Sequence, residues 1–316
     1  MRAAYAEAIN PDHPLAALTV GERPEPDADG WVTVDVRASA LNHHDLWSLR
    51  GVGLSADQLP MILGCDAAGV DADGNDVVVY PVINAATGDG RTVSILSEYF
   101  PGTLADRVAV PAENLVAKPP ELSFAEAACL PTAWLTAYRM VVSRGRLPAD
   151  GAVLVQGAGG GVATAAVVLG VALGARVYAT SRGADKRDRV AALGATAVEP
   201  GARLPERVDV VVETVGEATF DHSIKCARPG GRIVVSGATS GHLAVVNLRR
   251  IFAGQLEILG VTMGTRAELG ELLKLAADRA IRPVIDSEYG FSDVRGAFER
   301  LASGAVFGKV VVDHSR

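Results

Sequence analysis

Residues 151–163, GAVLVQGAGGGVA, decide the fold class of this 316-residue chain. The run GAVLVQ has the length of a buried strand, and a glycine-rich turn leads from it into the apolar run VATAAVVLGVAL, which suits a helix. Such a turn needs small residues because it is tight, the backbone must approach a pyrophosphate and the helix packs closely on the strand. Gly157, Gly160 and Ala163 have the required spacing, with alanine in place of the last glycine. The stretch therefore predicts a dinucleotide-binding strand–turn–helix of the Rossmann type.

The residues that follow this turn alternate between strand and helix patterns. Strands rich in Val and Ile are predicted at residues 175–180, 208–214, 232–237 and 256–263. Helices are predicted between the first three of these strands, and Pro229-Gly230-Gly231 is predicted to be a turn. Near-continuous apolar strands that alternate with helices are typical of a parallel sheet covered on both faces. The sequence thus predicts an α/β fold with a doubly wound parallel sheet.

The N-terminal part has the pattern of a β-rich domain. WVTVDVRA (31–38) alternates apolar and polar residues, NDVVVYPVI (75–83) is a second strand, and residues 103–119 contain two short ones. Residues 84–102 are polar and rich in turn formers, which predicts a surface loop.

Two capping-box patterns predict helix starts on either side of the Rossmann segment. Ser123 with Glu126 precedes a helical stretch that contains Pro131 and ends at Gly145. Thr265 with Glu268 precedes a second helix, after which a further helix near residue 292 and a final strand, FGKVVVD, complete the tail. The residues alone leave open whether this tail extends the Rossmann domain or returns to the first domain.

Length and composition limit the class of protein. The apolar fraction of 49% is enough for two ordinary cores, and the net charge of −7, with no long basic run, makes nucleic acid an unexpected partner. The three cysteines are scattered, which suits a reducing compartment. Residues 151–175 carry no charge, but the Gly/Ala-rich first half with Gln156 indicates a buried strand, turn and helix instead of a membrane span. The expectation is a soluble, cytoplasmic protein without a signal peptide.

The residues after the second Rossmann strand indicate the cofactor. NAD binders carry an Asp or Glu here that binds the ribose 2′-hydroxyl, whereas this chain has Ser181 and Arg182, followed by Lys186 and Arg187. A hydroxyl and an arginine would bind a 2′-phosphate, which a carboxylate would repel. We therefore expect NADP(H) in preference to NAD(H). The alternative is that Lys186 and Arg187 only form the solvated face of the next helix.

Several segments, in this order, resemble the medium-chain dehydrogenase/reductase superfamily, which includes zinc alcohol dehydrogenases and quinone oxidoreductases. They are ALNHHDLWSLRG (40–51), LPMILGCDAAGV (59–70), PGTLADRVAVPAENLVAKP (101–119), the glycine loop, DVVVETVG (209–216), PGGRIVVSGAT (229–239) and GKVVV (308–312). The resemblance implies a GroES-like catalytic domain formed by residues 1–125 and completed by 263–316. It also implies an inserted Rossmann NADP-binding domain at 126–262, an active site in the interdomain cleft, and a homodimer formed through the strand at 256–263.

The chain departs from this family at the zinc ligands. It has Asn42 where zinc members have Cys, Cys65 and Asp66 where they have His and Glu, and Thr132 where they have the third ligand. Asn and Thr are poor zinc ligands, and residues 85–102 lack the cysteines of the structural zinc lobe. We expect no metal. His43 and His44 are expected not to share an ion with Cys65, because neighbouring residues on a strand point to opposite faces.

Without zinc, negative charge on a substrate oxygen must be met by hydrogen-bond donors. The resemblance therefore implies hydride transfer from NADPH to a quinone or to an activated C=C bond of an enone or enoyl compound. In this hypothesis Asn42 donates to the acceptor oxygen, His44 donates the proton and Asp45 orients its neighbours, although each could be an ordinary loop residue. The predicted cofactor contacts are His43, Thr132, Gly157, Ala158, Gly159, Gly160, Gly161, Val162, Ser181, Arg182, Lys186, Thr214, Val215, Gly237, Ala238 and Lys309.

Two other functions remain open at this point. One is an alcohol or aldehyde dehydrogenase of the zinc-binding type with atypical ligands. The other, from a different class, is a non-catalytic NADPH-binding sensor or structural homologue. In each enzymatic case the partner is a small molecule whose identity the sequence does not give.

Overall fold

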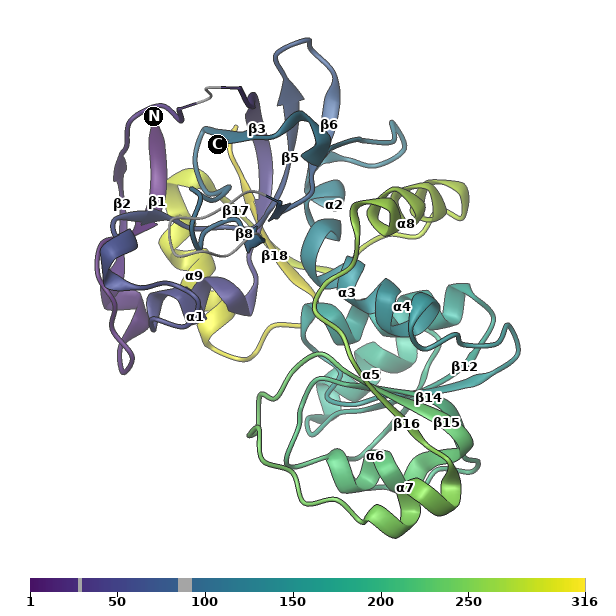
Figure 1. The fold of residues 1–316 in the computed structure, drawn as a ribbon. Coiled ribbons are helices and arrows are strands. Elements are labelled where there is room, and N and C mark those ends of the chain that lie inside the picture. Colours follow the sequence, from purple (N-terminus) through teal and green to yellow (C-terminus); the bar gives the residue numbers. More distant parts are fainter. Residues whose placement is uncertain (28–29, 85–92, 316) are drawn as a thin grey trace. The chain divides into compact units, whose positions relative to one another are not determined.

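The computed structural model describes residues 1–27, 30–84 and 93–315, and it divides the chain into two units (Figure 1). Unit 1 contains Met1–Thr132 and Leu269–Arg316, and unit 2 contains Ala133–Glu268. The predicted division of the chain into three segments lies close to these bounds. Residues 85–92 of the predicted loop at 84–102 fall outside the described residues.

Unit 2 contains one six-stranded sheet in which every pair of neighbouring strands is parallel. In spatial order the strands are β13 (Thr196–Val198), β12 (Arg176–Thr180), β11 (Ala152–Val155), β14 (Val208–Glu213), β15 (Ala227–Val235) and β16 (Glu257–Gly260). This is the strand order of a doubly wound Rossmann fold, so the predicted fold class is confirmed. The short strand β13 was not predicted, and β15 begins before the Pro229-Gly230-Gly231 segment that we expected to be a turn. A register shift between Val208 and Val210 accommodates this segment.

The helices of unit 2 are α3 (Leu135–Tyr138), α4 (Gly161–Ala172), α5 (Ala184–Ala192), α6 (Phe220–Cys226) and α7 (Leu248–Gly254). Most of them pack against the same sheet, and α3 packs against α4. Helix α4 contacts β11 and β12, whereas α6 and α7 contact β15 (Figure 1). The uncharged stretch at 151–175 forms β11, the glycine turn and α4, as predicted. Among the described residues, no helix has both the length and the apolar character needed to cross a membrane.

Unit 1 is built on a seven-stranded sheet that contains strands from both the N-terminal and the C-terminal part of the chain. Its strands are β10 (Leu115–Ala117), β6 (Asp76–Val79), β5 (Asp66–Asp71), β3 (Val32–Ala40), β18 (Lys309–Asp313), β17 (Ile285–Gly290) and β9 (Arg107–Val110). Strand β18 pairs with β3 in antiparallel register, so the C-terminal tail returns to the N-terminal unit. A smaller sheet consists of β2 (Leu18–Glu22), β1 (Arg2–Ala6) and β4 (Met61–Ile62), which were not predicted, and β7 (Val82–Ile83) pairs with β8 (Ser94–Ile95).

In the described part of unit 1 the α-helices are α1 (His43–Leu49), α2 (Phe124–Ala128), α8 (Arg266–Asp278), which belongs mainly to this unit, and α9 (Val294–Ala302). Both predicted capping boxes are present, because Ser123 and Glu126 exchange hydrogen bonds before α2, and Thr265 and Glu268 do so before α8. Apolar side chains of α1 and α9 share one core with β18. The stretch after α2 is less regular than expected, since residues Leu130–Trp134 and Arg139–Ser143 are π-helical.

The prediction that His43 and His44 lie on a strand is wrong. The strand β3 ends at Ala40, and both histidines belong to the first turn of α1. The backbone N–H of Asn42 donates to Asp45 Oδ2 at 2.8 Å, which satisfies a backbone donor at the start of the helix. The two histidines are therefore not separated by alternating strand faces.

Candidate functional site

The glycine loop lies between β11 and α4, with Gly160 as the N-cap of the helix. Gly157 has a positive φ of 70°, and a Cβ there would lie only 2.5 Å from Val215 Cγ2, so this position requires glycine. A Cβ on Gly160 would meet no atom within 4 Å. The first N–H groups of an α-helix have no partner within the helix, and their positive end attracts anions. The loop therefore combines open space at Gly160 with the backbone donors that a pyrophosphate needs.

A buried carboxylate supports the loops beside this turn. Glu213, at the end of β14, is fully buried and accepts hydrogen bonds from the backbone N–H groups of Val215 (2.8 Å) and Gly216 (3.0 Å). The hydroxyls of Thr219 and Ser223 donate to the same carboxylate at 2.9 and 2.6 Å. Each hydrogen bond of this kind to a buried charge is strong. The network holds the segment after β14, where Thr214 and Val215 were predicted to contact the cofactor.

The same network continues to the glycine loop. Gln156 donates to Ser223 Oγ at 3.0 Å and accepts from Thr180 Oγ1 at 2.9 Å. The hydroxyl of Thr180 also accepts from the N–H of Gly157 at 2.9 Å. The sequence did not reveal Glu213, Gln156 and Thr180 as supporting residues, since nothing in their spacing indicates that they meet.

The residues predicted to select the cofactor follow β12. Ser181 is buried and Arg182 is exposed. Lys186 lies on α5, and its Nζ would be 3.2 Å from a Cβ placed on Gly159, so its side chain extends over the glycine loop. Arg187 instead donates to the carbonyls of Ser181 and Arg182 at 3.1 and 2.9 Å, which braces their backbone.

The other predicted contacts in unit 2 lie at the same edge of the sheet. Gly237 and Ala238 follow β15 just as Thr214 and Val215 follow β14. Parallel strands end at one edge, so the glycine loop, residues 181–182, 214–215 and 237–238 are gathered there. Ligands of open α/β sheets bind at this carboxyl edge.

In unit 1, Asn42, Asp66 and Lys309 form a buried polar cluster. The Lys309 ammonium donates to Asn42 Oδ1 at 2.6 Å, to Asp66 Oδ2 at 2.9 Å and to the carbonyl of Leu41 at 2.9 Å. Asn42 Nδ2 in turn donates to Asp66 Oδ2 at 2.8 Å and, more weakly, to the carbonyl of Ala40 at 3.4 Å. Lys309 and Asp66 are 2% and 0% exposed. These contacts occupy the three N–H donors of Lys309, while its contact with the cofactor stays a prediction.

A second cluster surrounds His44, whose side chain is 22% exposed. Its Nε2 lies 3.1 Å from Glu98 Oε1, and its Nδ1 lies 3.5 Å from Cys65 Sγ and from the Ser97 and Ser48 hydroxyls. Burial lowers the pKa of His44, but its interactions with Cys65 and its hydrogen bond to Glu98 outweigh this effect and hold the pKa well above its usual range. Glu98 was not predicted, because it lies far from His44 along the chain.

The acidic neighbours of His44 are more deeply buried. Burial raises the pKa of the Cys65 thiol, although His44 opposes the change, and the thiol donates to the carbonyl of Leu96 at 3.2 Å. Burial also raises the pKa of Asp45 against the opposing charges of His44 and Lys309. Both carboxylate oxygens of Asp45 accept backbone N–H groups, from Asn42 and from Gly64. Asp45 therefore orients its surroundings.

His44, Asp45 and Cys65 offer ligand atoms within 4.8 Å of one another, which invites a test for zinc. A catalytic zinc needs three good protein ligands. Here Asp45 is committed to two backbone donors, the Cys65 thiol donates to a carbonyl, and only His44 keeps a nitrogen directed at the cluster. At the position of the family's first ligand, Asn42 offers an oxygen that already accepts the Lys309 ammonium. These residues do not fit a three-ligand zinc.

The two remaining predicted residues are His43 and Thr132. His43 is exposed in the first turn of α1, and Thr132 is half-buried in the π-helical segment Leu130–Trp134. Their cofactor contacts stay predictions.

Comparison with known proteins covers nearly the whole chain. Residues 28–120 match the profile of the alcohol dehydrogenase GroES-like domain, and residues 183–312 match that of zinc-binding dehydrogenases. A zinc-type alcohol dehydrogenase-like protein of Schizosaccharomyces pombe is 29% identical, over 92% of this chain and 93% of the relative. The acryloyl-coenzyme A reductase of Metallosphaera sedula is also 29% identical, with the same coverage. A crystal structure of an NAD-dependent alcohol dehydrogenase superimposes with a TM-score of 0.88 at 33% identity, over 99% of both chains.

Proposed function

Because the chain belongs to the medium-chain dehydrogenase/reductase superfamily, we propose that it is an NADPH-dependent reductase of activated C=C bonds that works without catalytic zinc. The observation that carries this proposal is the hydrogen bond from the Lys309 ammonium to Asn42 Oδ1, at 2.6 Å. Asn42 occupies the position at which zinc-binding members of the family have a metal ligand. A divalent cation there would face a buried positive charge. The similarity to an acryloyl-coenzyme A reductase favours an enoyl or enone acceptor over a quinone.

In this proposal the residues of unit 1 stabilise negative charge on the substrate oxygen and donate the proton. Bound NADPH would supply a hydride for the β-carbon of the acceptor. The Asn42 N–H that donates only weakly to Ala40, at 3.4 Å, is the one available to the substrate carbonyl oxygen. His44, held in its charged form beside Glu98 and Cys65, donates the proton that completes the reduction at the α-carbon.

Unit 2 would hold the cofactor at the carboxyl edge of its sheet. The pyrophosphate would bind to the first N–H groups of α4, where Gly160 leaves open space. Arg182 and Lys186 would bind the 2′-phosphate, and no carboxylate follows β12 directly to oppose it. This preference differs from that of the NAD-dependent structural neighbour.

An acceptor panel tests the activity. We expect the purified protein to oxidise NADPH with enoyl thioesters or enones, and faster than with matched quinones or saturated aldehydes. His44→Gln should lower kcat at least about tenfold because it removes the proton donor, whereas the exposed His13→Gln should match wild type. NADPH binding without oxidation by any acceptor would favour the non-catalytic alternative, and an unchanged kcat in His44→Gln would remove the proposed role of that residue.

A zinc-type alcohol dehydrogenase is the second candidate, favoured by the proximity of His44, Asp45 and Cys65. The hydrogen bond between His44 and Glu98 is of the kind that orients histidine ligands of metals. Metal analysis separates the two candidates. Stoichiometric zinc whose removal abolishes alcohol oxidation would overturn the zinc-free proposal.

We also propose a homodimer formed through the edge of the Rossmann sheet. Strand β16 has a strand partner on one side only among the described residues. Large apolar side chains are exposed in α7, which precedes β16, and in the residues just before it, with Val245 92% exposed, Phe252 71% and Leu248 70%. Pairing of β16 with its copy would satisfy the free edge and cover these side chains.

A further inference from the structure

A cavity of about 430 Å³ lies in unit 2 at the edge of the sheet where the strands begin. Arg207 directly precedes β14, Ala227 begins β15, and Leu256 directly precedes β16. The proposed cofactor residues lie at the opposite edge, after the strands end. The cavity is therefore distinct from the cofactor site, and its volume suits a small organic molecule.

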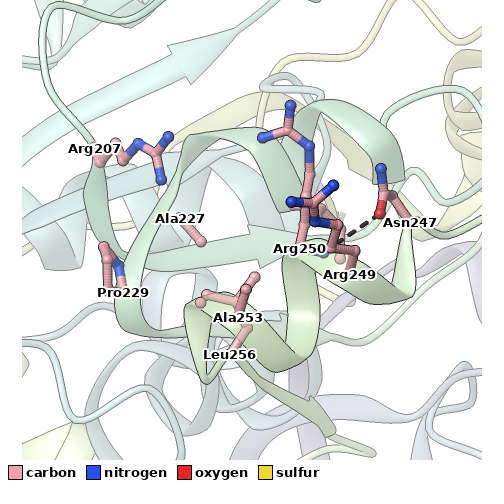
Figure 2. A pocket seen from close by; sticks show the side chains of 10 residues that line it. Arg207, Ala227, Pro229, Asn247, Arg249, Arg250, Ala253 and Leu256 are labelled. Atoms are coloured by element: carbon pink, nitrogen blue, oxygen red, sulfur yellow. Dashed lines mark hydrogen bonds between the residues drawn. The ribbon is translucent and has the colours of Figure 1, made fainter.

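Three arginines surround this cavity. Figure 2 shows Arg207 on one side and Arg249 and Arg250 on the other, and none of the ten lining residues is acidic. Within the part of the chain that the structure describes, the three guanidinium groups have neither a hydrogen bond nor an ion pair. Their concentration contrasts with the net charge of −7 of the whole chain. Like charges around one cavity repel each other, so a bound anion would lower the energy of the arrangement.

The nearby carboxylates are already engaged with other arginines. Arg232 pairs with Glu257 at 2.8 Å, Arg176 pairs with Glu206 at 2.6 Å, and Arg228 pairs with Asp209. These three arginines of unit 2 are thus neutralised by carboxylates, whereas the arginines at the cavity are not. An anionic ligand would neutralise the cavity arginines.

The apolar lining of the cavity adds a second requirement. Ile224, Ala227 and Leu256 line it together with the arginines. On α7, Arg249 lies three residues before Phe252 and therefore borders the proposed dimer face, whereas Arg250 lies on the other side of the helix from Leu248 and Phe252. A ligand that carried only charge would leave these apolar side chains exposed to solvent, whereas a ligand with an apolar body would cover them.

We propose that this cavity binds an organic anion that has a phosphate or similar multiply charged group on an apolar body. The guanidinium groups of Arg207, Arg249 and Arg250 would hold the charged group, since planar guanidinium donors match phosphate oxygens. Ile224, Ala227 and Leu256 would contact the apolar body. The site is independent of the reaction proposed above.

Calorimetric titration of phenyl phosphate into the full-length protein tests this site. Saturating NADPH is present so that the cofactor's own phosphate positions are blocked. We expect one phenyl phosphate per chain, with weaker binding of inorganic phosphate, which lacks the apolar body, and of benzyl alcohol, which lacks the charge. Added salt should weaken the binding.

Variants locate the binding. Arg207→Gln and the double variant Arg249→Gln/Arg250→Gln should each weaken phenyl phosphate binding at least about tenfold, because each removes charge-assisted hydrogen bonds. Arg203→Gln, an exposed arginine of the same unit outside the cavity, should bind as wild type does. Absence of binding to the wild-type protein, equal binding by the cavity variants, or an equal loss in Arg203→Gln would each overturn the proposal. Thermal unfolding of the variants checks that these substitutions leave the fold intact.

Discussion

Replacing Gly157 and Gly160 separately by alanine should distinguish a glycine that the fold needs from one that the cofactor needs. Gly157 has a φ of 70°, and the left-handed conformation costs alanine about 1–2 kcal/mol. The new Cβ would also lie 2.5 Å from Val215 Cγ2, and relieving such overpacking costs about 1–3 kcal/mol. Val215 cannot move freely because its N–H donates to Glu213. We therefore expect Gly157→Ala to lower the free energy of unfolding by about 2–5 kcal/mol.

Gly160→Ala should behave differently. Its φ of −76° suits any residue and its Cβ would meet nothing within 4 Å, so only the weaker N-cap preference of alanine counts, about 1 kcal/mol or less. A bound pyrophosphate, however, would meet the added methyl group and lose at least one charge-assisted hydrogen bond, about tenfold or more in affinity. Urea unfolding followed by circular dichroism and titration with NADPH measure the two effects. A Gly157→Ala variant as stable as wild type, or a Gly160→Ala variant with unchanged affinity for NADPH, would refute these assignments.

Four further predictions address the cofactor, the proton donor, the dimer and the C-terminus. Arg182→Ala should weaken NADPH binding about ten- to hundredfold and leave NADH binding unchanged, because only NADPH carries the 2′-phosphate; an equal loss for both cofactors would contradict its role. Glu98→Gln removes a group that raises the pKa of His44, so the alkaline limb of the kcat/KM profile should move to lower pH, and an unmoved limb would count against the pair. Phe252→Asp should convert the dimer into monomers in light scattering, and a monomeric wild type would rule the dimer out. Burial lowers the pKa of His314 from 6.5 to about 4, so the unfolded chain binds a proton at this residue more readily than the folded chain does. The free energy of unfolding should therefore fall by up to about 3 kcal/mol as the pH falls from 6.5 to 4. His314→Gln should reduce that loss, and an unchanged pH dependence would mean that other groups cause it.

The Rossmann unit could be predicted because its determinants are local in the sequence. The strands β11, β14 and β15 contain runs of Val, Leu or Ile, and the glycine turn, the following helix and the next strand succeed each other within one short segment. The small strands β1, β2 and β13 carried weaker patterns and were missed. Residues 229–231, expected to be a turn, fall within the bounds of β15 but have no partner in β14: the pairing passes from Ala227 opposite Val208 to Arg232 opposite Val210, and Gly230 has a φ of 72°.

The candidate site was predictable only in part, because its residues meet through tertiary contacts. Asn42, His44 and Asp45 were selected from one segment, but their helical conformation was not expected. The Asn42-x-x-Asp45 spacing, with a polar residue at each position, was the feature that could have revealed the helix start. Glu98 and Glu213 have no such local feature, since each acts on residues that only the fold brings near.

The Lys309 cluster links the architecture of unit 1 to its chemistry. Strand β18 brings Lys309 from the end of the chain to β3 and β5, where its ammonium balances the buried Asp66 carboxylate. Removing one partner of such a buried pair is expensive, about 3–5 kcal/mol, so the contact also fastens the C-terminal tail to the N-terminal sheet. The same ammonium occupies the Asn42 oxygen at 2.6 Å and makes that position unfavourable for a cation. The ion pair of Lys309 with Asp66, which joins the C-terminal strand to the N-terminal sheet, would therefore also account for zinc-free chemistry in this chain. Asn42→Cys alone would not create a metal site, because the Lys309 ammonium would still lie there; Lys309 would have to be replaced as well.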